Sequence, residues 1–191
     1  MSSKGKLFLV VGPSGSGKGS MIAKLKQRHP EYIFPLSCTT RDPRPGEKEG
    51  EVYHYIRKDE FVKGIEEGEF LEWAEVHQDN YYGILKKPIF EALEEGKIVI
   101  REIDIQGFKS VSALVPPENL IGVFIMVTEL DELKRRILMR GKLPDEEIER
   151  RLESARKEIA ESYLCPYTID SIPGEIDRMA DDMEVIIAKE I

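Results

Sequence analysis

An apolar run followed at once by a glycine-rich segment opens the chain and limits the folds available to it. Residues 7–11 read LFLVV, which predicts a short buried strand, and residues 12–20 read GPSGSGKGS. Helical spacing of Met21, Ile22 and Leu25 follows over residues 18–29, until Pro30 ends it. A glycine-rich turn between a strand and a helix suits a phosphate, because backbone N–H groups and the positive end of the helix dipole converge there.

The pattern GxxxxGK between a strand and a helix is more specific than a glycine-rich turn alone, and it favours a phosphate loop over a plain connecting turn. Lys18 would supply a point charge to the outer phosphates of the ligand. The usual Ser or Thr after the lysine is replaced by Gly19, a form typical of many nucleoside monophosphate kinases. We therefore expect Mg²⁺ to be held mainly by phosphates and water, with Ser20 as a candidate nearby. The residues expected to form this phosphate loop, which the family resemblance given below implies to bind ATP, are Gly12, Pro13, Ser14, Gly15, Ser16, Gly17, Lys18, Gly19 and Ser20.

The rest of the chain predicts an α/β fold with a parallel central sheet. Apolar runs at 97–105 and 121–127 have strand length, and helix-compatible sequence lies between them and at 129–140. Two more helices are predicted at 145–161, with Asp145 as a cap, and at 175–190. Residues 33–84 differ, since short aromatic and β-branched runs with one small helix at 59–67 indicate a mixed-strand insertion.

Composition narrows the classes of partner. The 191 residues suit one domain, and 36 acidic against 28 basic side chains give a net charge of −8, which argues against a nucleic-acid-binding surface. The two cysteines and three histidines have no metal-site spacing. No stretch has the length of a membrane span and the start lacks an apolar signal core, so we expect a reducing, cytoplasmic setting with no membrane partner. The sequence does not indicate an oligomeric state.

The segment SCTTRDPRPGE (37–47) suggests a second phosphate site. Arg41 and Arg44 lie on a loop that Pro43 and Pro45 stiffen, and two guanidinium groups suit a dianionic phosphate. The alternative is a solvated polar loop. The tyrosines of GEVYHYI and NYYGI could add neutral donors, although tyrosines in strands more often serve packing.

The strand EFLEWAEV carries a candidate base-reading carboxylate. Alternation places Phe70, Glu72, Ala74 and Val76 on one face, and an inward Glu72 would need a partner. Guanine offers its N1–H and 2-amino group as a donor pair, whereas adenine has no such edge. The alternative is that Leu71 and Trp73 face inward and Glu72 is solvated.

Together these stretches resemble the guanylate kinases. The matching segments run through most of the chain: GPSGSGKGS, SCTTRDPRPGE, FLEWAEVHQDNYYG, IDIQG and RRILMRGKLPDEEIERRL. The resemblance implies a P-loop three-layer core (about 1–36, 91–129 and 161–191), a mixed α/β nucleotide-monophosphate-binding insertion (about 37–90) and a helical lid (about 130–160). It implies ATP-dependent phosphorylation of GMP, and of dGMP, with Mg²⁺.

The resemblance also implies roles for individual residues. Lid arginines Arg140 and Arg151 would reach the transferring phosphoryl group, with Arg135 and Arg136 as further candidates, and Lys18 and Arg41 would share in catalysis. Ordinary helix pairing is the alternative for Arg151, because Glu147 lies four residues before it. The residues implied to bind GMP are Ser37, Arg41, Arg44, Tyr53, Glu72, Tyr82 and Asp104.

Three departures from the family pattern bear on the substrate. Ile84 stands where a hydroxyl of the family helps to read guanine, Glu102 replaces the common first Asp of DIDxQG, and DSIPG replaces an Asn-Asp pair near the C-terminus. Losing one hydrogen bond to the base costs about 1 kcal/mol, which weakens guanine selectivity without abolishing it. Two alternatives remain: a kinase of the same fold with another acceptor, such as a different nucleoside monophosphate or a ribose bisphosphate, and a non-catalytic phosphopeptide-binding module.

Overall fold

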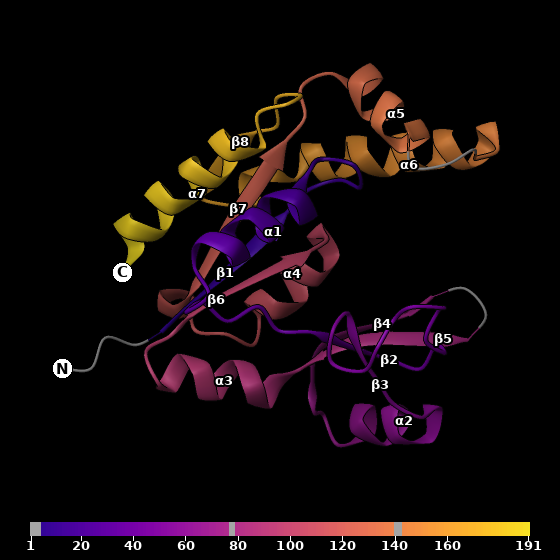
Figure 1. Ribbon diagram of the computed structural model, residues 1–191, viewed down its shortest axis with the longest axis vertical. Helices are drawn as coiled ribbons and strands as arrows, with labels where there is room; N and C mark the ends of the chain where they lie inside the picture. The colour runs from indigo at the N-terminus through magenta and orange to yellow at the C-terminus, as the bar shows by residue number, and fades with distance from the viewer. Residues whose placement is uncertain (1–4, 77–78, 140–142) are drawn as a thin grey trace.

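The computed structural model describes residues 5–76, 79–139 and 143–191. Its centre is a four-stranded parallel sheet in the order β6–β1–β7–β8 (Figure 1). The strands are β1 (Lys6–Val11), β6 (Ile98–Ile103), β7 (Leu120–Met126) and β8 (Tyr167–Asp170). Because β1 has β6 on one side and β7 on the other, its carboxyl end lies at the point where the strand order reverses, where such sheets bind ligands.

Helices cover both faces of this sheet because alternate residues of β1 point in opposite directions. Leu7, Leu9 and Val11 pack with α3 (Lys86–Glu94) and α4 (Ile105–Ser112). Phe8 and Val10 pack with α1 (Lys18–Arg28) and α7 (Ile176–Glu190). The result is a three-layer core in which β1 is buried from Leu7 to Val11.

A second sheet forms most of the insertion, in the order β3–β2–β5–β4. Its strands are β2 (Ser37–Thr39), β3 (Tyr53–Tyr55), β4 (Phe70–Val76) and β5 (Asn80–Leu85), and α2 (Lys58–Glu66) packs on it. Cys38, Phe61 and Phe70 make a small core of their own. Only β2 and β3 pair in parallel, which confirms the predicted mixed-strand character.

Helices α5 (Leu130–Met139) and α6 (Asp145–Ala160) form a third part, joined through Leu133, Ile137, Ile148 and Leu152. Short 3-10 turns at Pro117–Asn119 and Ser162–Leu164 complete the chain. The prediction that Asp145 caps α6 is wrong. Pro144 takes the cap position with an extended backbone, and Asp145 is the first helical residue, where its charge still suits the helix dipole.

The predicted fold class is confirmed: a P-loop three-layer α/β core with a parallel sheet, a mixed insertion and a helical segment after β7. Helix α3 was not predicted, and the apolar run at 97–105 contains a shorter strand because Asp104 already caps α4. In the described ranges, no helix has both the length and the apolar character needed to cross a bilayer.

Candidate active site

The phosphate loop follows β1 directly and its backbone needs glycine at two places. Gly12 has φ +142°, and a Cβ there would lie 2.7 Å from the Ile125 carbonyl of the neighbouring strand. Gly17 has φ +94° and forms the N-terminal cap of α1. These conformations are rare for L-residues, so the loop turns sharply and presents the first N–H groups of α1 to the cavity. The predicted strand, turn and helix are confirmed.

The side chain of Lys18 lies against its own loop. Its Nζ donates to the carbonyl oxygens of Gly12 at 2.5 Å and Pro13 at 3.0 Å. Beside it lies an open cavity of about 540 Å³. The lining residues come from the loop, the end of β6 and α6: Gly12, Ser14, Gly15, Gly17, Lys18, Gly19, Arg101, Glu102, Ile103, Asp104 and Glu158.

Two carboxylates stand at the carboxyl end of β6, next to the loop. The Glu102 Oε2 lies 3.7 Å from the point that a Cβ atom would occupy at Gly19. Asp104 caps α4 by accepting a hydrogen bond from the Gly107 amide at 2.7 Å, and it lines three cavities. Within the described ranges, no cluster of three or more His, Cys, Asp or Glu side chains could hold a metal ion. A hard cation here would therefore depend on phosphate and water oxygens as well as on single side chains.

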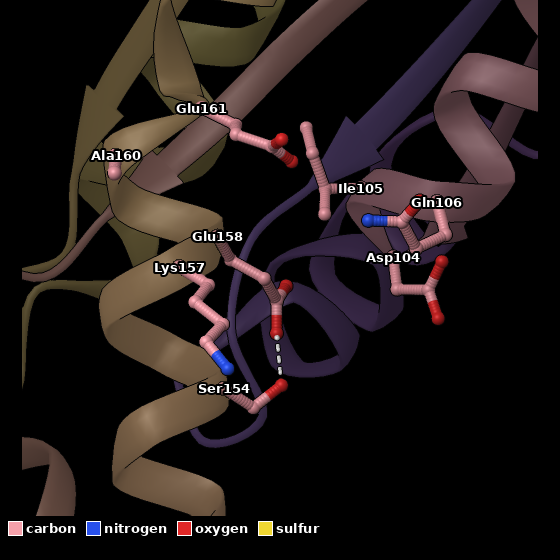
Figure 2. Close-up of a pocket in the computed structure, with 8 residues that line it drawn as sticks. All are labelled: Asp104, Ile105, Gln106, Ser154, Lys157, Glu158, Ala160 and Glu161. Carbon is pink, nitrogen blue, oxygen red and sulfur yellow. Dashed lines mark hydrogen bonds between the residues drawn. The ribbon is translucent and has the colours of Figure 1, made fainter.

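Glu158 of α6 was not predicted and faces the loop. Figure 2 shows it projecting from α6 toward the segment that carries Asp104, with Ser154 donating to it at 3.4 Å. Burial raises the pKa of Glu158, and the nearby Lys18 opposes that shift. Its helical spacing was visible in the sequence, but nothing in the pattern showed that α6 lies across from the loop.

The predicted second anion site is built around Arg41. The guanidinium is ion-paired with Glu47 at 2.9 Å and lies over the rings of Tyr53 and Tyr55, 5.5 and 5.8 Å from their centroids. Tyr82 packs edge-on against Tyr53 at 5.7 Å. Arg41, Tyr53 and Tyr82 are thus brought together as predicted. Arg44 lies exposed on the same loop, and its backbone N–H donates to Glu47 at 2.8 Å.

Glu47 orders this loop and was not among the predicted site residues. Hydrogen bonds from the Arg44 amide, the Tyr55 hydroxyl and the Arg41 guanidinium lower the pKa of Glu47 to about 2. In the free protein this carboxylate offers Arg41 an anionic partner. An incoming phosphate would compete for the same donors.

The pKa of Glu47 gives a pH-dependence prediction. A lowered folded pKa means that the stabilisation is present above the ordinary value of 4.5 and is lost as pH falls toward 2. We expect Glu47→Gln to lower the melting temperature at pH 7, and the difference from wild type to shrink steadily below pH 4.5. Thermal unfolding from pH 7 to pH 3 measures this, with the exposed Glu66→Gln of α2 as control. A difference independent of pH would contradict the assignment.

Glu72 lies on β4 directly opposite Ile84 of β5. A bulge between Phe70 and Glu72 breaks the alternation, so Leu71 is buried at 3% exposure while Trp73 is 46% exposed. The alternative that Leu71 and Trp73 both face inward is therefore wrong for Trp73. Burial raises the pKa of Glu72, and the positive charge of Arg101 partly offsets this rise. A desolvated carboxylate of this kind suits a paired donor edge.

Arg101 of β6 is a third residue that was not predicted, after Glu158 and Glu47. Its Nη2 donates to the Ser37 hydroxyl at 2.5 Å and its Nη1 to the Pro35 carbonyl at 3.1 Å. It thereby links the core sheet to the start of the insertion. Its position inside an apolar strand gave no signal, because only the tertiary structure brings β6 beside Ser37.

The arginines of α5 and α6 differ in position. Arg136 reaches the core: it donates to the Ser171 hydroxyl at 2.7 Å, and Ser171 donates to the Ser16 carbonyl of the loop at 2.7 Å. Arg135 pairs with Glu132 at 2.8 Å. Arg151 pairs with Glu147 at 2.8 Å within α6, as ordinary helix pairing predicts. Arg140 lies outside the described residues.

A further cavity of about 340 Å³ lies beside the loop, toward α5 and α7. Ser20 lines it, together with Arg136 and the apolar side chains of Met139, Ile172 and Pro173. Ser20 is therefore beside this second space, whereas Gly19 faces the cavity that contains Lys18.

Comparisons with known proteins agree with this geometry. The guanylate kinase family matches residues 4–189. A guanylate kinase of a Synechococcus species is 38% identical over 97% of this chain and 83% of its own, and one of Helicobacter pylori is 45% identical over 83% and 76%. The solved guanylate kinase of Anaplasma phagocytophilum superposes with a TM-score of 0.73 at 28% identity, covering 98% of this chain and 87% of that one. The chain belongs to the guanylate kinase family.

Proposed function

We propose that the protein transfers the γ-phosphoryl group of ATP to GMP, and to dGMP, giving ADP and GDP or dGDP. The observation that carries this proposal is the continuity of the site. Asp104 lines both the cavity beside Lys18 and the cavity beside Glu72, so the phosphate loop and the base-reading carboxylate border neighbouring spaces. Family membership supports the same reaction.

The acceptor in this reaction needs no general base. An oxygen of the GMP phosphate is already anionic at neutral pH, and it attacks the γ-phosphorus while the bond to the ADP oxygen breaks. The protein's task is to hold the two phosphates in line and to neutralise charge. We assign Lys18 and the backbone N–H groups of 14–20 to the donor, and Arg41, Arg44, Tyr53 and Tyr82 to the acceptor phosphate.

Guanine would be read by the other end of the acceptor site. Glu72 is assigned to the N1–H and 2-amino group. Arg101, whose charge acts on Glu72, donates a hydrogen bond to the Ser37 hydroxyl, which is assigned to the same base. Asp104 borders the same space. A carboxylate that is desolvated in the free protein regains hydrogen bonds when this base binds, which favours guanine over adenine.

The donor nucleotide would lie along the loop with its base in the cavity of about 340 Å³. Met139, Ile172 and Pro173 give this space apolar walls and Arg136 gives it a planar cation, which suits a stacked purine. Mg²⁺ with ATP fits the carboxylate of Glu102, which lies beside Gly19 in the cavity of Lys18, with phosphates and water as further ligands. Ser20 lines the neighbouring cavity and would contact the ion through water. When bound, it would neutralise phosphate charge.

Helices α5 and α6 are proposed to act as a lid. Closure would bring arginines of this segment to the transferring group and exclude water, which would otherwise hydrolyse ATP. Arg136 already contacts the core through Ser171. Arg151 would exchange Glu147 for phosphate oxygens, and Arg140 is assigned the same task by its motif.

The two alternatives are less well supported. A phosphopeptide-binding module has no use for a complete phosphate loop with Lys18. A base-free acceptor such as a ribose bisphosphate has no use for a desolvated carboxylate at Glu72. Neither alternative explains why Lys18 and Glu72 line neighbouring cavities that share Asp104.

Arg44→Ala tests the assignment of the acceptor phosphate site. We expect the KM for GMP to rise by about 10- to 100-fold, because a charge-assisted contact of roughly 1.5–3 kcal/mol is lost, while the KM for ATP stays within about twofold. Lys48→Ala is the matched control, since Lys48 lies on the same loop and pairs with Glu51 at 3.6 Å. Equal weakening of both substrates would contradict this placement of the phosphate.

A further inference from the structure

The floor of the acceptor site contains an arginine whose hydrogen bonding is incomplete. Of the Arg101 donors, Nη1 and Nη2 have the acceptors Pro35 and Ser37. The Nε is buried and has no hydrogen-bond partner within the described ranges. A buried donor without an acceptor is costly, so a residue that served only to join β6 to the insertion would be expected to have its donors satisfied.

The surroundings of Arg101 are those of the proposed base site. It donates to Ser37 and lines the cavity beside the phosphate loop, which shares Asp104 with the cavity that Glu72 lines, and its charge lowers the pKa of Glu72 against the effect of burial. Burial lowers the pKa of Arg101, and the neighbouring Glu102 and Glu72 oppose that shift. No ion pair joins Arg101 to Glu72 in the part of the chain that the structure describes. The two opposite charges therefore border neighbouring cavities, joined at Asp104, without an ion pair between them.

The same site lacks a hydroxyl where one is expected. Ile84 lies opposite Glu72 on the neighbouring strand and is 2% exposed in the apolar core. It cannot donate to the O6 of guanine. Guanine carries its donors, N1–H and the 2-amino group, next to its acceptors, O6 and N7. A base held by Glu72 at the first edge needs a donor at the second, and arginine fits O6 and N7 with paired hydrogen bonds.

We propose that Arg101 is a specificity-determining residue that donates hydrogen bonds to O6 and N7 of guanine and so replaces the hydroxyl that is absent at Ile84. This inference rests on the proposed use of GMP. It also explains rejection of adenine, whose 6-amino group would oppose an arginine donor to donor. Ser37 would accept from Arg101 and keep its own hydroxyl proton for the ligand.

The test uses analogues that alter one edge of the base. Steady-state rates are measured for wild type and Arg101→Leu with GMP, 7-deaza-GMP, which lacks the N7 acceptor, and IMP, which lacks only the 2-amino group. We expect wild type to use 7-deaza-GMP several-fold less well than GMP, and Arg101→Leu to use the two equally. The variant should lose about 10- to 100-fold in kcat/KM for GMP and keep the wild-type ratio of GMP to IMP, because Glu72 reads that difference.

Two further variants separate the charge of Arg101 from its paired hydrogen-bond donors and test the role of Ile84. Arg101→Lys retains the charge but loses the paired donors, so its ratio of GMP to 7-deaza-GMP should also fall. Adding Ile84→Ser to Arg101→Leu should restore part of the GMP rate and none of the sensitivity to N7. The decisive results are the ratios of GMP to 7-deaza-GMP and of GMP to IMP, and a smaller folded fraction does not change a ratio measured in one preparation.

The outcomes separate this inference from the proposed function. If Arg101→Leu slows GMP and 7-deaza-GMP by the same factor, Arg101 only positions Ser37 and the insertion, and the inference is wrong while GMP kinase activity stands. If wild type itself does not phosphorylate GMP, the proposed function fails, and the inference fails with it.

Discussion

Replacing Lys18 with methionine will lower kcat for the transfer from ATP to GMP by about 10²- to 10³-fold. Methionine keeps the length of the side chain and removes the charge that we assign to the outer phosphates, where donors aimed at developing charge have effects of that size. In the free protein Lys18 makes hydrogen bonds within its own loop, to Gly12 and Pro13. The rate is measured by coupled ADP production at saturating GMP.

Lys26→Met is the matched control, because Lys26 lies exposed on the same helix away from the loop. The control should keep the wild-type rate. Both variants should melt within a few degrees of wild type, which shows that the loss is not unfolding. A Lys18→Met enzyme with more than about a tenth of the wild-type kcat would contradict the role of Lys18.

Replacing Glu72 with glutamine will lower kcat/KM for GMP by about 100-fold or more and will shrink the preference for GMP over IMP. The amide can accept one base donor but opposes the other, so the 2-amino group loses its partner. Although the substitution lowers activity, we do not expect it to lower the stability of the fold. A carboxylate with a raised folded pKa destabilises the fold as pH rises through that pKa, so the variant should melt no lower than wild type at pH 7.

Glu75→Gln is the control for this change, since Glu75 is exposed on the same strand and meets the Tyr81 hydroxyl at 3.3 Å. It should leave both kcat/KM and the ratio of GMP to IMP unchanged. An unaltered GMP rate in Glu72→Gln, or a rate loss with the GMP to IMP ratio intact, would show that Glu72 does not read the base.

Local sequence patterns were enough to predict the phosphate loop and the core that carries it. The run LFLVV, the spacing GxxxxGK and the apolar residues of α1 depend on neighbours a few positions away. The cluster formed by Arg41, Tyr53 and Tyr82 joins segments that are far apart in the chain, and it was expected only from the resemblance of their motifs to the guanylate kinases. The phosphate loop and its core, in contrast, follow from backbone geometry over short distances.

What the sequence did not reveal depends on contacts between distant segments. The bulge before Glu72 changed the expected alternation of β4, and strand pairing with β5 decides where it falls. Arg101 is read as part of an apolar strand until Ser37 is placed beside it, 64 residues earlier in the chain. Glu158 lines the cavity beside Lys18 because α6 lies across from the phosphate loop, and this placement depends on the tertiary structure. The predicted helix cap at Asp145 was wrong, because Pro144 takes the cap position and fixes the backbone there.

The central claim is that ATP and GMP are the substrates, and an acceptor panel tests it most directly. Coupled ADP production is measured with ATP and Mg²⁺ against GMP, dGMP, IMP, AMP, UMP and a ribose bisphosphate. The account predicts rapid turnover with GMP and dGMP, weak turnover with IMP, and rates near the acceptor-free background with the others. Turnover spread across the bases, confined to the ribose bisphosphate, or absent with every acceptor would contradict it.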